Sequence, residues 1–93
     1  MSSEDVMSQC PENIAKLAKD IMKQFDPKTA RVNDPIYQKW YKEKFLPSLY
    51  PKQHLADQAL DYLASIGFIK AGQLHNGTDW WLLTKDGYEY INK

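Results

Sequence analysis

The dipeptide Asn76-Gly77 restricts the fold of this chain more than any other feature of the sequence. A two-residue type I′ turn needs positive φ at both central positions, and asparagine followed by glycine adopts it most readily. Because stretches rich in aromatic and aliphatic residues lie on both sides, the sequence predicts a β-hairpin. Gly67 stands where a preceding helix would end, and Thr84 can cap a short helix that follows.

The composition of the 93-residue chain is that of one small globular domain. Hydrophobic residues make up 43% and aromatic residues 13%, which suits a packed core rather than a disordered chain. No apolar run approaches the roughly 20 residues that span a bilayer, and residues 1–5 lack the features of a secretory signal. Cys10 is the only cysteine, so no internal disulfide and no cysteine-based metal site are predicted. We expect a cytoplasmic protein that does not enter a membrane.

Charge is distributed unevenly along the chain, although twelve basic and twelve acidic side chains cancel. Residues 27–54 hold six basic side chains against Asp34 and Glu43, whereas residues 1–26 and 55–93 each hold three lysines against five acids. Non-specific DNA binding depends mainly on neutralising phosphates, so the neutral total argues against a strong nucleic-acid binder. The basic segment at residues 27–54, called the basic centre below, is the part of the chain that favours nucleic-acid binding.

The N-terminal part of the chain predicts a tail followed by a helix. Residues 1–10 lack apolar periodicity and are predicted to be a flexible tail, and residues 11–93 to be a single domain. Pro11 suits the first turn of a helix, which should end near Asp26-Pro27 because the residue before proline is pushed out of the helical region. One apolar stripe supports this helix: Ile14, Leu17, Ala18, Ile21, Met22 and Phe25.

Two further helices are predicted in the centre. Asp34-Pro35 is a start signal for the second, and Pro47 should end it near Leu46. Pro51 suits the first turn of the third, whose end Gly67 marks. The apolar side of the second helix would be Ile36, Tyr37, Trp40, Tyr41 and either Lys44 or Phe45. The buried stripe of the third would be Leu55, Ala59, Leu60, Leu63 and Ile66.

A two-residue turn would set the register of the hairpin. The resulting pairs are Gln73 with Trp80, Gly72 with Trp81, and Ala71 with Leu82. Since neighbouring residues of a strand alternate in direction, the two tryptophans point to opposite faces. If Leu83 packs on the core, Trp81 shares its face, and Trp80 and Leu82 lie on a face open to solvent or to a partner.

The third helix and the end of the hairpin together resemble the winged-helix superfamily. Residues 59–69 (ALDYLASIGFI) are similar to the helix that closes in Leu-x-x-x-Gly-Phe-Ile, and residues 81–91 (WLLTKDGYEYI) to the aromatic-x-Leu-Thr-x-x-Gly-x-x-Tyr-Ile end of the wing. The resemblance covers residues 11–91 as architecture and 55–91 as motif. It implies a mainly α fold with a small antiparallel β-hairpin: three helices, the wing and a short C-terminal helix. It also implies that the third helix enters a major groove of DNA.

Carried over onto this chain, the resemblance assigns DNA contacts to the third helix, the basic centre and the wing. Gln53 and Gln58 could pair with adenine and Lys52 with guanine or phosphate, although Asp57 and Asp61 would repel the backbone. A solvated helix face is the alternative for these positions, and solubilising charge is the alternative for the lysines. The candidate DNA-contacting residues are Lys39, Lys42, Lys52, Gln53, His54, Gln58, Lys70 and Asn76.

Two functional hypotheses follow. The first is a small DNA-binding transcriptional regulator or accessory factor of bacterial or phage type. The second is a protein-interaction module that uses the wing and the third helix without binding DNA, or that self-associates through the wing. Neutral charge and Trp80 motivate the second, since tryptophan is enriched at binding hot spots, although packing against the tail or the first helix is the alternative for Trp80. Its candidate partner-contacting residues are Trp80 and Leu82.

No motif for catalysis or metal binding is present. His54 and His75 lie far apart in sequence, without a cysteine or carboxylate at ligand spacing. Cys10 has no evident base that would make it a nucleophile. We therefore expect no catalytic residue, no metal and no cofactor.

Overall fold

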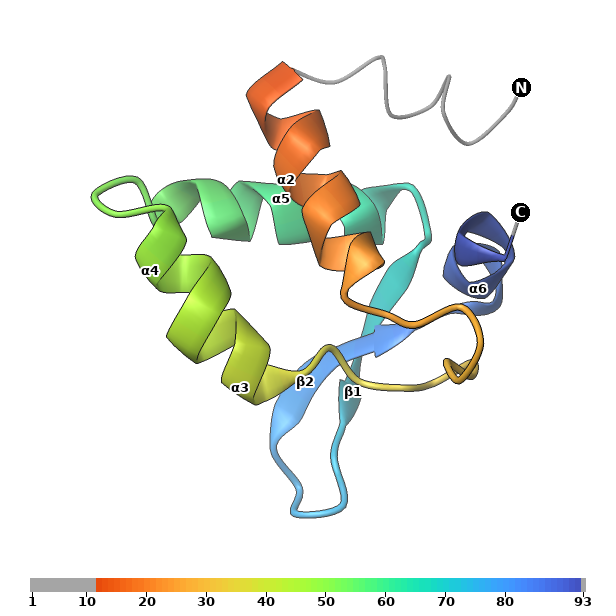
Figure 1. The fold of residues 1–93 in the computed structure, drawn as a ribbon. Coiled ribbons are helices and arrows are strands. Elements are labelled where there is room, and N and C mark those ends of the chain that lie inside the picture. The colour runs from red at the N-terminus through yellow and green to blue at the C-terminus, as the bar shows by residue number, and fades with distance from the viewer. Residues whose placement is uncertain (1–11, 93) are drawn as a thin grey trace.

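The computed structural model describes residues 12–92, and the tail predicted at residues 1–10 lies outside them. The described chain is mainly helical and contains one two-stranded antiparallel sheet. In chain order the elements are α2 (Glu12–Lys23), α3 (Gln38–Trp40), the π-helical turn η1 (Tyr41–Phe45), α4 (Leu46–Ser48), α5 (His54–Ser65), β1 (Ile69–Gln73), β2 (Asp79–Leu83) and α6 (Lys85–Ile91). α3, η1 and α4 follow one another without a break (Figure 1) and are referred to below as the second helix.

The apolar faces of α2 and α5 form most of the core, where the two helices cross (Figure 1). The stripe predicted for the first helix is confirmed, because all its members are buried apart from the half-buried Leu17. The helix ends at Lys23, and Asp26 lies in the turn that follows, where its carbonyl accepts from Thr29 N–H at 3.1 Å. On α5 the fully or nearly buried residues are Ala56, Ala59, Leu60 and Leu63, while Leu55 and Ile66 are half-buried.

The predicted helix start at Asp34-Pro35 is wrong, because residues 34–36 are not helical and the segment 33–36 bonds to β2. Asn33 N–H donates to Leu83 O at 2.7 Å, and Leu83 N–H donates to Asp34 O at 2.8 Å. Ile36 N–H completes the pairing by donating to a β2 carbonyl at 3.1 Å, that of Trp81. Proline is tolerated here because the bonds to β2 use Asn33 N–H, Asp34 O and Ile36 N–H, so the missing N–H of Pro35 is not needed. The pairing places Ile36 in the core at 1% exposure. The second helix therefore begins at residue 38.

Pro47 does not end the second helix, which continues to Ser48. A proline inside a helix lacks one N–H donor, and its ring collides with the carbonyl four residues earlier, here that of Glu43. The π-helical turn before Pro47 widens the backbone at this point, and Leu46 N–H bonds to Tyr41 O five residues back. The third helix starts at His54 rather than at Pro51, which lies in a preceding turn with a cis peptide bond.

The hairpin is confirmed, but its predicted turn and register are wrong. Gly77 N–H donates to Leu74 O at 2.9 Å and Leu74 N–H donates to Thr78 O at 2.9 Å, so three residues form the loop. Within this loop only Gly77 has positive φ, at 81°, which is the arrangement of a type I turn followed by a glycine bulge. The extra residue shifts every pair by one: Ile69 with Leu83, Lys70 with Leu82, Ala71 with Trp81, Gly72 with Trp80, and Gln73 with Asp79.

Helix caps connect the end of α5 to the start of α6, at Gly67 and Thr84 as predicted. Gly67 has φ of 84°, and the bond from Phe68 N–H to Leu63 O at 3.0 Å closes the helix end. Thr84 Oγ1 accepts from Gly87 N–H at 3.1 Å and donates to Gly67 O, which connects the start of α6 to the end of α5. The hairpin is therefore held at its base by two helix termini.

Candidate binding surfaces

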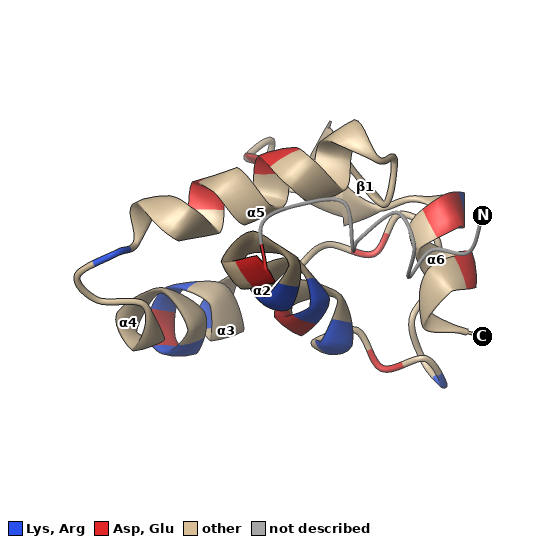
Figure 2. Cartoon of the chain, turned by 90° about the horizontal axis from the view of Figure 1, so that it is seen from above, with Lys and Arg blue, Asp and Glu red and all other residues tan. Residues whose placement is uncertain are grey.

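Charge is unevenly distributed over the helices, because α5 carries only acidic charged side chains whereas α2 and the second helix carry lysines together with Glu12, Asp20 and Glu43. α5 exposes Asp57 and Asp61, and no lysine or arginine occurs from residue 53 to residue 69. Figure 2 shows only acidic positions on α5, whereas basic positions gather on α2 and on the second helix, below α5 in this view. These two helices expose Lys16, Lys19, Lys23, Lys39, Lys42 and Lys44. The face that the resemblance assigns to DNA reading is thus the acidic one.

The predicted DNA-contacting residues are spread over several elements. Lys39 and Lys42 lie on the second helix, Lys52 and Gln53 before α5, His54 and Gln58 on α5, Lys70 on β1, and Asn76 in the hairpin loop. All are exposed apart from the half-buried Gln53. Each of the two α5 candidates is followed three residues later by an exposed aspartate, so the carboxylates interleave with the polar donors on one helix face. Asn76 is also occupied within the loop, where its side-chain oxygen accepts from Thr78 N–H at 3.0 Å.

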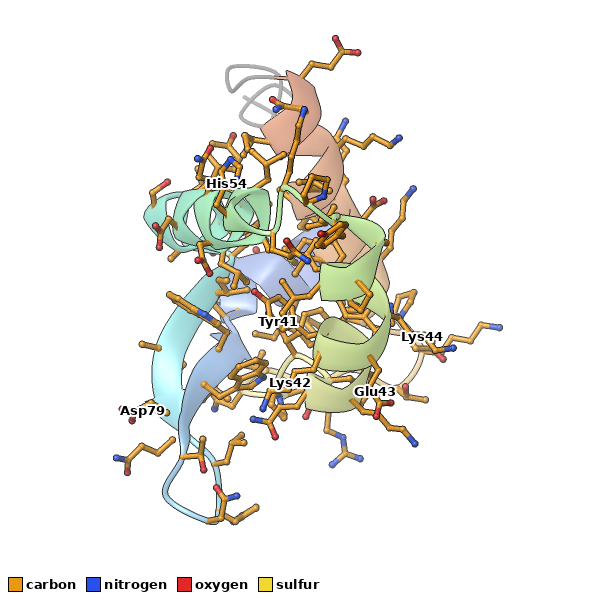
Figure 3. The ribbon with its side chains drawn as sticks, turned by 90° about the vertical axis from the view of Figure 1, so that its left-hand side faces the viewer. Tyr41, Lys42, Glu43, Lys44, His54 and Asp79 are labelled. Carbon is orange, nitrogen blue, oxygen red and sulfur yellow. The ribbon has the colours of Figure 1, made fainter. Side chains whose placement is uncertain are left out.

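Trp80 lies at the junction of the hairpin and the second helix. Its indole N–H donates to Ile36 O at 2.6 Å, and its ring meets that of Tyr41 edge-on, with 5.5 Å between centroids. Lys42 Nζ lies 6.0 Å from the centre of the Trp80 ring. Figure 3 shows Tyr41 and Lys42 on the side of the second helix that faces the hairpin, and Lys44 on the other side. Trp80 is therefore half-buried and engaged within the domain.

Leu82 forms the wall of a shallow hollow beside the hairpin loop. Its side chain lies over Gly72, where an added Cβ would collide with Leu82 Cδ1. The hollow has a volume of about 640 Å³ and is open to solvent on the outer face of the hairpin. It is lined by Asn33, Pro35, Gln73, Leu74, His75, Asn76 and Leu82. Of the two candidate partner-contacting residues, Leu82 thus borders accessible space more directly than Trp80.

Tyr41 connects the second helix to the acidic face of α5. Burial raises the pKa of Tyr41 above its usual value of 10.0, and the negative charge of Asp57 raises it further. Both effects disfavour the phenolate in the folded protein. The folded protein therefore favours an uncharged side chain at Tyr41.

We expect Tyr41→Phe to make stability less sensitive to alkaline pH. The pKa of Tyr41 is higher in the folded protein than in the unfolded chain, so the unfolded chain loses the phenol proton first as pH rises past about 10. The stabilisation that the protonated phenol provides below that pH is therefore lost as pH rises through the folded pKa. Urea unfolding at about pH 9 and pH 11 should show a smaller loss in the free energy of unfolding for Tyr41→Phe than for wild type. Tyr50→Phe, at a ring that is 78% exposed, is the control and should retain the wild-type loss.

A groove follows the side of the domain where α2 packs near the second helix. It consists of two adjoining hollows, of about 370 Å³ and 350 Å³, that share Asp20, Phe45 and Ser48. The first is otherwise lined by Lys23, Gln24, Trp40 and Lys44, and the second by Asn13, Lys16, Leu17, Leu49 and Leu55. This hollowed region is called the α2–α4 groove below, and no periodic pattern in the sequence indicates it, because its lining comes from three helices. The half-buried Leu17 at the margin of the α2 stripe was the one available hint.

The described residues contain neither a candidate metal site nor a membrane-spanning helix. Within residues 12–92, no three histidine, cysteine, aspartate or glutamate side chains come close enough to hold a metal ion. None of the helices in this range is both long and apolar enough to cross a membrane. No protein-family model, no curated protein and no solved structure matches the chain.

Proposed function

We propose that this chain is a non-catalytic winged-helix domain of the cytoplasm that binds other proteins rather than reading DNA sequence with α5. The winged-helix assignment is supported by the order of elements: a helix, a short extended segment paired with the sheet, two helices, the hairpin and a terminal helix. The short segment at residues 33–36 pairs with the second half of β2, which strengthens the likeness beyond the motifs at residues 55–91.

The acidic face of α5 is the observation that carries the choice of protein over DNA. Asp57 and Asp61 are exposed on the helix that would enter the major groove, and no lysine or arginine from residue 53 to residue 69 offsets them. Phosphate neutralisation supplies essentially all non-specific DNA affinity, so two carboxylates at this place oppose docking. A protein surface with basic or neutral groups meets no such repulsion.

A second candidate is a DNA-binding regulator that contacts mainly the phosphate backbone. It is favoured by the exposure of Lys39, Lys52 and Lys70, which come from three different elements around α5. In this case the polar side chains at the start of α5 would contribute little to DNA affinity, and that affinity would fall steeply with increasing salt.

Titration of fluorescently labelled duplex DNA tests the proposal. At about 50 mM salt we expect wild type to bind random-sequence duplex more weakly than about 10⁻⁴ M, without a measurable salt slope. Asp57→Asn/Asp61→Asn removes the two charges while keeping the shape of both side chains, and a helix face that never meets DNA should gain little affinity from it.

DNA binding by the wild-type protein would contradict the proposal. Tighter binding by wild type, with a salt slope that falls when Lys52 is changed to glutamine, would replace the proposal with the second candidate. Lys85→Gln, at an exposed position on α6, is the matched control for a general loss of charge.

A further inference from the structure

We propose that the α2–α4 groove is the docking site for an acidic amphipathic helix of a partner protein. This inference rests on the proposed protein-binding function and names the partner that one of its surfaces fits. It differs from the wing and the face of α5 in both position and charge. Three properties of the groove support it: an apolar stretch of its floor, a basic rim, and a helical wall of suitable length.

The floor of the groove contains an apolar, partly accessible stretch, which lies mainly in the second hollow. Phe45 is buried at 5% exposure, and its ring stacks on Trp40 with 5.0 Å between centroids. Leu17, Leu49 and Leu55 are half-buried around it. Apolar side chains that remain partly exposed along one groove are the usual feature of a surface that receives the apolar face of a helix.

The rim of the groove is basic. Lys16 and Lys23 stand on α2 and Lys44 on the second helix, all three exposed, while Asp20 is the one acid among the lining residues of the two hollows. Lys16 and Lys23 are two helical turns apart, about 10 Å. An amphipathic helix with glutamate or aspartate beside its apolar stripe would place carboxylates along both walls, and complementary charge would guide the encounter.

The geometry of the walls favours a helix over an extended peptide or a nucleic acid. Helical side chains line both walls, so the groove offers no strand edge that could bond to an extended backbone. The twelve residues of α2 correspond to about 18 Å, which matches about three turns of a partner helix. A nucleic acid would meet the lysines but would leave the apolar floor uncovered.

Fluorescence anisotropy with designed peptides tests the proposal on the full chain. The probe is a labelled 15-residue helical peptide with leucines at positions i, i+3, i+4 and i+7 and glutamate on both flanks. Two matched probes have either every glutamate changed to lysine or every leucine changed to serine. We expect saturable binding of the first probe and at least about a tenfold weaker affinity for each of the others.

Charge reversal in the protein locates the site. Lys16→Glu/Lys44→Glu changes two exposed rim residues and should weaken binding of the acidic probe at least about tenfold. Lys28→Glu/Lys85→Glu changes the net charge equally at exposed positions outside the groove lining and should leave affinity within about twofold. Both variants retain every buried residue, and circular dichroism would verify that they fold.

Several results would overturn the proposal. Equal binding of the serine probe would mean a general attraction for polyanions, and equal losses in both charge-reversal variants would place the peptide elsewhere. A tighter affinity after Glu4→Gln/Asp5→Asn would assign the groove to the chain's own N-terminal segment. A wild-type dimer that Lys44→Glu dissociates would assign it to a second copy. If the acidic peptide does not bind and wild type does not bind DNA either, only the docking role of the groove is ruled out, and the proposed function stands.

Discussion

Replacing Gly87 with alanine should lower the free energy of unfolding by about 3 kcal/mol, although alanine is the better helix former. Gly87 is buried in α6, and a Cβ at this position would collide with the backbone carbonyl oxygen of Phe68 and lie 2.8 Å from Leu83 Cδ1. The carbonyl belongs to the segment that enters β1, so it cannot rotate away as a flexible side chain could. The gain in helix propensity is about 1 kcal/mol, and the clash should exceed it.

Urea unfolding followed by circular dichroism would measure this effect. Glu89→Ala is the matched control, since it makes the same residue at an exposed position of the same helix and should be neutral or slightly stabilising. If Gly87→Ala were as stable as wild type, α6 would have to pack less closely on Phe68 than the structure shows.

Trp80→Ala should also destabilise the fold by about 3 kcal/mol. The substitution removes the edge-on contact with Tyr41 and leaves the carbonyl of Ile36 without its indole donor. A tryptophan that served only as an exposed contact for a partner would change stability by less than about 0.5 kcal/mol when removed. The measured value therefore distinguishes a structural role from the predicted partner contact.

Trp80→Phe separates the two parts of this effect. Phenylalanine keeps an aromatic ring against Tyr41 but has no N–H for Ile36 O, so we expect a loss of about 1 kcal/mol. Circular dichroism is the suitable measurement for both variants, because the substitution itself alters tryptophan fluorescence. Equal stability of the alanine and phenylalanine variants would mean that the ring contact contributes nothing.

The helical core was predictable because periodicity reports burial directly. Ile21 and Leu63 belong to stripes with spacings of three and four, and both are completely buried. The end of α5 was predictable for a different reason: Gly67 adopts the left-handed conformation that few other residues tolerate. In each case the physical cause lies within a few residues of the feature that it determines.

The hairpin illustrates a limit of local signals. Asn76-Gly77 suits a two-residue turn, but the same glycine also suits the bulge position of a three-residue loop, which the structure adopts. The choice moves the register by one, so Ala71 rather than Gly72 lies opposite Trp81. Residue types around the turn do not distinguish the two, because tryptophans occupy both faces of the strand.

The remaining errors come from contacts between distant segments. Asp34-Pro35 has the composition of a helix start, yet both residues belong to a segment that pairs with β2, which no local pattern reveals. The candidate sites divide in the same way. The acidic face of α5 was visible in the spacing of Asp57 and Asp61, whereas the α2–α4 groove depends on how three helices pack.

The pairing of residues 33–36 with β2 also bears on aggregation. The sequence of β2 contains Trp-Trp-Leu-Leu, the kind of segment that recruits other chains when its backbone is unpaired. With β1 on one side and residues 33–36 on the other, the second half of β2, from Trp81 to Leu83, is paired along both edges. The outer edge of β1 is five residues long and contains Lys70 and Gly72. A lysine and a glycine make the β1 edge a poor template for amyloid growth. The fold thus pairs the aggregation-prone Trp-Leu-Leu part of β2 on both sides and leaves a less aggregation-prone strand at the edge.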